Sequence, residues 1–185
     1  MRDLMDLNLA ELEGVLREWG YPAFHARSIF GWLYQKKAQD FQVMSNLPLE
    51  LRRKLSQEFR LFNFRLAEKA VSRDQTIKFL FELADKQRIE AVSIPTEKRL
   101  TACISSQAGC KFACAFCASG LLGFTRNLSC AEILEQVLRI KNHHSDRSLT
   151  HIVFMGTGEP LDNYEVVLKA VRLVNAKEGL GIGAR

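Results

Sequence analysis

Residues 100–117 read Leu-Thr-Ala-Cys-Ile-Ser-Ser-Gln-Ala-Gly-Cys-Lys-Phe-Ala-Cys-Ala-Phe-Cys, and this stretch decides how the second half of the chain is interpreted. Its start predicts a strand that leads into a loop with Cys110, Cys114 and Cys117. Thiolates are soft ligands that suit zinc or iron–sulfur clusters. A structural zinc site needs four ligands, whereas this loop offers three, so the spacing favours a four-iron cluster with one iron open to another ligand. The alternative is a zinc site completed by Cys103 or a histidine.

Downstream of the cysteines, the pattern is typical of a parallel α/β structure. A helix is expected to begin after Ser129, with Glu132 placed to complete a capping box. A strand is expected over residues 151–155, followed by a glycine turn and a helix over residues 163–174. The chain after Leu100 has room for two β/α units, fewer than a closed barrel requires. We therefore expect the front part of a longer protein.

The first part of the chain is expected to be a small helical bundle. Helices are predicted over residues 9–19, after a capping box of Asn8 and Glu11, over residues 24–34, and from Pro48 onward.

A β-hairpin is expected after the bundle. Apolar residues alternate with other residues over residues 76–83, which predicts a half-buried strand, and residues 88–94 would return as its partner. The expected domains are a helical domain at residues 1–70, a hairpin connector at residues 71–95 and an α/β core at residues 96–185.

Composition and charge limit the class of protein. The 185 residues are 47% hydrophobic and 25% charged, which excludes a disordered, collagen-like or coiled-coil protein. No apolar run is long enough to span a membrane, and the acidic start is unlike a signal peptide, so we expect a cytoplasmic protein without a membrane partner. The formal net charge is +5, and basic residues gather in residues 51–100. That segment is compatible with nucleic-acid binding or with a solvated helix face.

The glycine turn after residues 151–155 is a second candidate site. Gly156 and Gly158 would let the backbone approach a ligand closely, and Glu159 is an anion suited to an ammonium group. The alternatives are an ordinary turn or a dinucleotide site, but a dinucleotide site requires glycine where this chain has Leu161.

Glu90 and Cys103 are further candidates on the predicted strands. Glu90 would share a face with Val92 and Ile94, and a carboxylate on an apolar face tends to have a raised pKa and can act as a base. The alternative is an exposed glutamate of an edge strand. Cys103 by itself is typical of a small buried hydrophobe, and Cys130 of a helix start or core.

Several motifs resemble those of one known family, in the same order along the chain. The spacing C-x3-C-x-aromatic-C, with Phe116 as the aromatic residue, is the signature of the radical S-adenosylmethionine (SAM) enzymes. Further segments resemble the radical SAM methyltransferases that act on C2 of adenine in large-subunit ribosomal RNA and in tRNA. These segments are residues 29–34, 89–95, 105–110, 123–128 and 155–160. The resemblance starts near Leu12, and the C-terminal half of that family is missing here.

The resemblance implies a helical domain that contacts RNA, followed by the first β/α units of a partial radical SAM barrel. It implies a [4Fe-4S] cluster on Cys110, Cys114 and Cys117, with SAM bound to the open iron and cleaved to a 5′-deoxyadenosyl radical. It also implies that Gly158 and Glu159 bind SAM.

The same resemblance assigns roles to two more residues. Glu90 would be the proton acceptor at adenine C2, and Cys103 would form a transient disulfide with a methyl-carrying cysteine that these residues lack. The implied partners are ribosomal RNA, tRNA and an electron donor such as flavodoxin or ferredoxin, and a monomer is expected. Two rivals remain: the C8-methylating resistance relative of the family and a non-catalytic zinc-binding RNA module. We expect the 185 residues alone to methylate no RNA and to aggregate.

Overall fold

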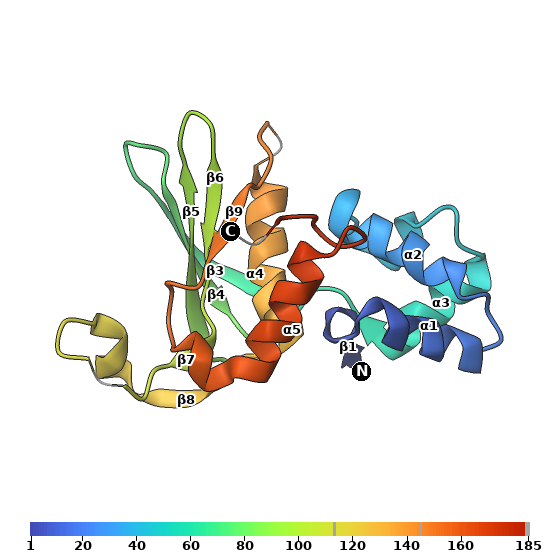
Figure 1. The fold of residues 1–185 in the computed structure, drawn as a ribbon, viewed down its shortest axis with the longest axis horizontal. Coiled ribbons are helices and arrows are strands. Elements are labelled where there is room, and N and C mark those ends of the chain that lie inside the picture. The colour runs from blue at the N-terminus through green and yellow to red at the C-terminus, as the bar shows by residue number, and fades with distance from the viewer. Residues whose placement is uncertain (113, 145, 184–185) are drawn as a thin grey trace. The chain divides into compact units, whose positions relative to one another are not determined.

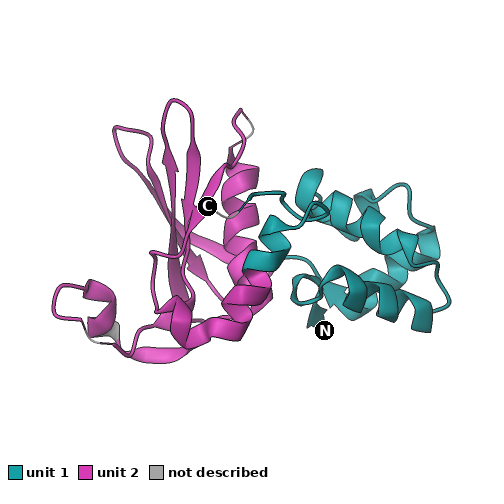
Figure 2. Ribbon diagram, viewed as in Figure 1, with its two compact units in different colours: residues 1–62, 171–185 teal, residues 63–170 magenta. Residues whose placement is uncertain are grey.

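The structure is a computed structural model that describes residues 1–112, 114–144 and 146–183. The chain divides into two compact units (Figure 2). Unit 1 comprises residues 1–62 and 171–185, and unit 2 comprises residues 63–170. Among the described helices, none has the length and apolar character needed to cross a membrane.

Unit 1 contains the three helices that the sequence predicts: α1 (Leu9–Glu18), α2 (Phe24–Phe30) and α3 (Leu49–Glu58). The capping box of α1 is present. Asn8 Oδ1 accepts a hydrogen bond from the Glu11 N–H at 2.9 Å, and the Glu11 carboxylate accepts one from the Asn8 N–H at 2.6 Å. The apolar faces of the helices pack together, with the following side chains almost fully buried: Leu12, Leu16, Ile29, Phe30, Leu51 and Leu55.

The other elements of unit 1 are short. A π-helical turn, η2 (Gly31–Gln35), extends α2 to the end expected from the sequence. Two-residue strands β1 (Arg2–Asp3) and β2 (Phe59–Arg60) pair in parallel, which no periodicity could predict at that length. The remaining elements are η1 (Leu4–Asp6) and η3 (Phe41–Val43).

Unit 2 is built on a five-stranded sheet with the strand order β3-β4-β5-β6-β9. β4 and β5 form the expected hairpin, in which Leu80 lies opposite Glu90. β6 and β9 are parallel, and the other neighbouring strands are antiparallel. The strands are β3 (Arg65–Val71), β4 (Ile77–Glu82), β5 (Arg88–Pro95), β6 (Leu100–Cys103) and β9 (His151–Val153).

The strand β3 is missing from the sequence-based prediction. Most of its side chains are exposed, so its sequence lacks the alternation that marks a half-buried strand. The domain boundary expected at residue 70 falls inside this strand, whereas the structure divides the chain between residues 62 and 63. The hairpin is also no separate connector, because β5 pairs directly with β6.

The α/β fold class is confirmed by two β/α units. They are formed by β6, α4 (Cys130–His143), β9 and α5 (Tyr164–Asn175), the last of which begins in unit 2 and ends in unit 1. The capping box of Ser129 and Glu132 is present at the start of α4. The remaining elements of unit 2 are β7 (Gln107–Gly109), η4 (Ala118–Leu122), β8 (Phe124–Asn127) and η5 (Pro160–Asn163).

The two faces of the sheet differ. Helix α4 lies along one face (Figure 1), where Ile89, Ala91 and Ser93 of β5 are buried. The opposite face of the same strand carries Glu90 and Ile94, which are exposed. Unit 2 therefore has a packed side that holds its core and an open side that carries Glu90.

Candidate functional site

The candidate site lies where β6 and β9 end. These strands are parallel neighbours, so their carboxyl ends meet at one edge of the sheet, which is where α/β proteins place ligands. The chain after β6 runs through Ser105, Ser106 and Gln107, which we call the junction, and then into the cysteine loop at residues 110–123. The chain after β9 forms the glycine turn at residues 155–160.

Ser105 ties three elements together. Its buried hydroxyl donates a hydrogen bond to the backbone carbonyl of Glu90 at 2.6 Å and accepts one from the Thr157 N–H at 2.8 Å. On the other side, the Gln136 side chain of α4 accepts from the Ser105 N–H at 2.8 Å and donates to the Ser105 carbonyl at 3.0 Å. One side chain thus joins the Glu90 strand to the glycine turn, and α4 holds its backbone in place.

The glycines of the glycine turn lie close against the junction. A Cβ atom on Gly156 would lie 2.6 Å from Ser105 Oγ, and one on Gly158 would lie 2.6 Å from Gln107 Cβ. Gly158 also has a φ of +104°, which side chains rarely tolerate. These glycines therefore allow close packing against the junction.

Glu159 is held at both its backbone and its side chain. Its N–H donates to Gln107 Oε1 at 2.9 Å, and its carboxylate accepts from the Leu161 N–H at 3.0 Å at the start of η5. The residue is half-buried. Glu159 is therefore presented by the glycine turn in a defined position, directly after Gly158.

The cysteine loop is closed at its base and exposed beyond it. β7 and β8 pair there, and the Cys110 N–H donates to the Gly123 carbonyl at 2.9 Å. The loop between these strands, yellow in Figure 1, extends away from the sheet. Phe112 is 51% exposed and Phe116 is 92% exposed, so neither aromatic residue of the loop belongs to the core of unit 2.

The three cysteines of this loop are free thiols. Cys114 is exposed, and Cys110 and Cys117 are half-buried. Hydrogen bonds from Ser119, first from its backbone and then from its side chain, hold the pKa of Cys117 below its ordinary value. Thiolates are the form that binds metal, so the donor set suits an iron–sulfur cluster. Among the described residues, however, no three potential ligands are gathered around one point.

Glu90 and Cys103 lie on the open face of the sheet. Cys103 pairs with Val92, two residues from Glu90, so the side chains share that face. The Glu90 side chain is 48% exposed, and its carboxylate lies 3.0 Å from Lys78 Nζ. The surroundings of Glu90 are therefore less apolar than the sequence suggests, because the adjacent strand contributes a lysine.

The two remaining cysteines are buried. Burial raises the pKa of the Cys103 thiol, and a hydrogen bond from the backbone of Met155 opposes this effect. Cys130 is 4% exposed at the start of α4, as the sequence predicts. Cys103 thus combines the burial expected of a small hydrophobe with a position beside the glycine turn.

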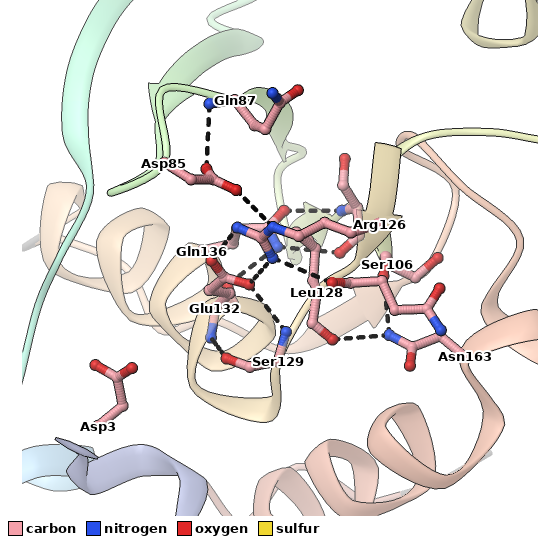
Figure 3. Close-up of polar contacts among 12 residues, drawn as sticks. Asp3, Asp85, Gln87, Ser106, Arg126, Leu128, Ser129, Glu132, Gln136 and Asn163 are labelled. Carbon is pink, nitrogen blue, oxygen red and sulfur yellow. Dashed lines mark hydrogen bonds and ion pairs between the residues drawn. The ribbon is translucent and has the colours of Figure 1, made fainter. Parts of the chain in front are cut away.

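Several supporting residues were not identified from the sequence (Figure 3). Arg126 of β8 donates to Asp85 at 2.6 Å and to both carboxylate oxygens of Glu132 at 2.8 Å. The buried Asn163 donates to the carbonyls of Ser106 and Leu128 at 3.0 and 2.9 Å. These contacts hold the base of the cysteine loop against α4 and η5. The sequence signal that could have identified these residues is a polar side chain at a position that the apolar pattern assigns to neither a helix nor a strand.

Comparisons with known proteins agree with this arrangement. Residues 2–61 match the model of the ribosomal RNA large subunit methyltransferase N-terminal domain, and residues 104–184 match that of the radical SAM superfamily. Over 184 residues the chain is 42% identical to a "Probable dual-specificity RNA methyltransferase RlmN" of Caldicellulosiruptor saccharolyticus, covering 100% of this chain and 53% of that protein. A protein of the same name from Prochlorococcus marinus is 47% identical over 184 residues, covering 98% and 51%.

A solved structure is similar over the whole chain. The crystal structure of a radical SAM methyltransferase from Sphaerobacter thermophilus has a TM-score of 0.94 and 41% identity, covering 100% of this chain and 55% of that one. The chain thus spans about half the length of the relatives it matches. Enzymes of this superfamily use a [4Fe-4S] cluster and SAM, for which the cysteine loop supplies suitable thiols. Over its whole length the chain is therefore similar to radical SAM methyltransferases, among them proteins named as dual-specificity RNA methyltransferases, and its residues 104–184 match the radical SAM superfamily.

Proposed function

We propose that this chain is the cluster- and SAM-binding part of an enzyme that methylates C2 of adenine in large-subunit ribosomal RNA and in tRNA. The observation that carries the proposal is the Ser105 hydroxyl, which joins the Glu90 strand to the glycine turn at the edge where the cysteine loop begins. The proposed base, the proposed SAM-binding turn and the cluster loop are thereby arranged around one edge of the sheet.

Cys110, Cys114 and Cys117 are the proposed cluster ligands. When bound, the cluster supplies the electron that cleaves SAM. The three thiols occupy one loop that is closed at its base, and the lowered pKa of Cys117 favours its thiolate. Gly158 and Glu159 are the proposed SAM contacts, because a carboxylate presented by this turn can pair with the amino group of SAM.

Glu90 and Cys103 are proposed to act on the open face of the sheet. Glu90 accepts the proton that leaves adenine C2, a role that its half-exposed carboxylate allows. Cys103, as a thiolate, attacks the sulfur of a methyl-carrying cysteine outside these residues, so that a transient disulfide forms as the bond from that sulfur to the transferred carbon breaks and the methylated adenine leaves. Its place on the same face as Glu90 supports this role.

The partners are proposed from the family and from unit 1. Unit 1 presents Lys54 over the Trp19 ring at 4.6 Å and Lys36 over the Trp32 ring at 4.1 Å, and such side chains can contact phosphates and stack on bases. We propose that unit 1 contacts the RNA. An electron donor such as flavodoxin or ferredoxin, a monomeric state and a cytoplasmic location complete the proposal.

The test uses a chimera in which residues 1–185 replace the matching half of the Caldicellulosiruptor relative. After anaerobic reconstitution it is incubated with SAM, a reductant and ribosomal RNA or tRNA, and the digested nucleosides are analysed by chromatography with mass spectrometry. We expect C2-methyladenine, and none from a chimera with Cys117→Ala. Formation of C8-methyladenine would contradict C2 methylation and would support the activity of the C8-methylating resistance relative. A colourless protein that binds zinc without methylating RNA would overturn the proposal.

The role of Glu90 is tested in the same chimera. Glu90→Gln should retain the cluster and cleave SAM, yet fail to release C2-methyladenine, because the amide cannot accept the proton. Glu97→Gln, an exposed carboxylate in the turn after β5, is the matched control. A wild-type product yield from Glu90→Gln would exclude Glu90 as the base.

A further inference from the structure

A chain of polar contacts links the cysteine loop to the glycine turn. Lys111, directly after the first cysteine of the loop, forms an ion pair with Asp162 of η5, with 2.5 Å between Nζ and Oδ1. The other carboxylate oxygen of Asp162 accepts a hydrogen bond from Gln107 Nε2 at 2.8 Å. Gln107 Oε1 then accepts from the N–H of Glu159 at 2.9 Å. The contacts therefore run from Lys111 through Asp162 and Gln107 to Glu159.

Gln107 is suited to transmit position because its amide oxygen and both of its amide N–H groups are hydrogen-bonded. Its oxygen accepts from Glu159, and its nitrogen donates to Asn127 Oδ1 and Asp162 Oδ2, both at 2.8 Å. A flipped amide would place its NH2 group against the Glu159 N–H and lose all three bonds. The residue is fully buried, so water cannot replace them. The orientation of the Gln107 amide is therefore set by its three partners.

Asp162 is the residue where the two loops meet. Its side chain is 19% exposed, whereas that of Lys111 is 51% exposed, so the carboxylate is the better-fixed member of the pair. The hydrogen bond from Lys111, followed by that from Gln107, holds the pKa of Asp162 below its ordinary value, against the effect of burial. An ionised Asp162 can serve both partners at once, one with each oxygen.

We propose that Asp162 is a positioning residue that couples the cysteine loop to the SAM-binding turn, acting through Lys111 on one side and through Gln107 on Glu159 on the other. This inference rests on the proposed function, because Glu159 is proposed there to bind SAM. The consequence is that the position of the Cys110 segment affects the Glu159 backbone, although the two lie far apart in the sequence. A side chain that touches neither cluster nor SAM would then affect SAM affinity.

The first test needs no cofactor. Amide hydrogen exchange of Glu159 is measured by NMR in the metal-free chimera, because its N–H reports on the Gln107 bond. We expect Asp162→Ala to speed this exchange by roughly three- to tenfold and Lys111→Met by about twofold. Lys111→Arg keeps the ion pair and should restore the wild-type rate. Lys86→Met removes a similar lysine–carboxylate pair, to Glu82 at 3.1 Å, and is the matched control.

The second test measures SAM affinity in the reconstituted chimera. Lys111→Met and Asp162→Asn should each weaken SAM binding by roughly three- to tenfold, and the double variant no more than the stronger single one, because both break the same link. KM for SAM should rise with kcat unchanged. Additive losses, or exchange at Glu159 in Asp162→Ala equal to that in Lys86→Met, would overturn the coupling. Absence of SAM binding by the wild type would refute the proposed function, while the exchange test would still decide the coupling.

Discussion

The cysteine loop and the junction leave the same sheet edge consecutively, yet they are held in opposite ways. Ser105, Ser106 and Gln107 are fully buried or nearly so, and hydrogen bonds join them to the strands, α4 and η5. The loop that follows exposes Phe116 and Cys114. Protein packing thus shapes the surroundings of Glu90 and Glu159, whereas among the described residues no three potential metal ligands gather around one point.

The largest expected effect is at the glycine turn. Gly158→Ala should destabilise the metal-free chimera by about 2–4 kcal/mol, because its Cβ would clash with the junction and its backbone conformation disfavours a side chain. Urea unfolding followed by circular dichroism measures this loss. Gly14→Ala is the control, since its Cβ meets no atom within 4 Å and lies in helix α1. Equal stability of the two variants would contradict close packing of the turn.

Two adjacent serines allow a sharper comparison within the junction. Ser105→Ala should cost about 2–3 kcal/mol, because it leaves the Glu90 carbonyl and the Thr157 N–H without their buried partner. Ser106 is equally buried, but its hydroxyl has no hydrogen-bond partner among the described residues. Ser106→Ala should therefore be neutral or slightly stabilising in the same unfolding experiment. Equal losses of stability in the two variants would show that burial alone, without the Ser105 hydrogen bonds, sets the cost.

The glycine turn is also expected to contribute to SAM affinity through Glu159. In the reconstituted chimera, Glu159→Ala should weaken SAM binding by about ten- to a hundredfold, or roughly 1.5–3 kcal/mol, because one charge-assisted contact is lost. The absorption of the cluster should stay the same. Glu165→Ala, an exposed carboxylate in the first turn of α5, is the control. If Glu159→Ala leaves the SAM affinity unchanged, the glycine turn has only a structural role.

The smallest effect on stability is expected in the cysteine loop. Replacing Cys114 with Ala should change the unfolding free energy of the metal-free chimera by less than about 0.5 kcal/mol, because the side chain is exposed. The same variant should bind less iron on anaerobic reconstitution, measured by iron analysis and visible absorption. Cys130→Ala should do the opposite, lowering stability and leaving the iron content unchanged. Loss of iron only in Cys130→Ala would contradict the ligand assignment.

Much of the architecture could be read from local patterns. Both capping boxes, the hairpin of β4 and β5 and the two β/α units follow from periodicity and helix-start residues, which act within a few positions of one another. The strand β3 was not predicted, because its side chains are mostly exposed and its sequence lacks the alternation of apolar and polar residues. Glu90 shares a face with Val92 and Ile94, as expected, but it also forms an ion pair with Lys78. Lys78 lies on a neighbouring strand, and the local sequence pattern does not specify the register between the two strands.

The sequence by itself determined the spacing of the three thiols, the order of the motifs and the positions of most helices and strands, since each depends on neighbouring residues. Only the tertiary structure decided that one hydroxyl bridges Glu90 and Thr157, that Gly158 packs against Gln107, and that Asp162 joins the two loops. The Ser105 bonds span 15 and 52 residues of sequence, and the Gln107–Asp162 bond spans 55. Such contacts depend on strand register and on where a crossover helix returns the chain, and neither is encoded in any short stretch of residues.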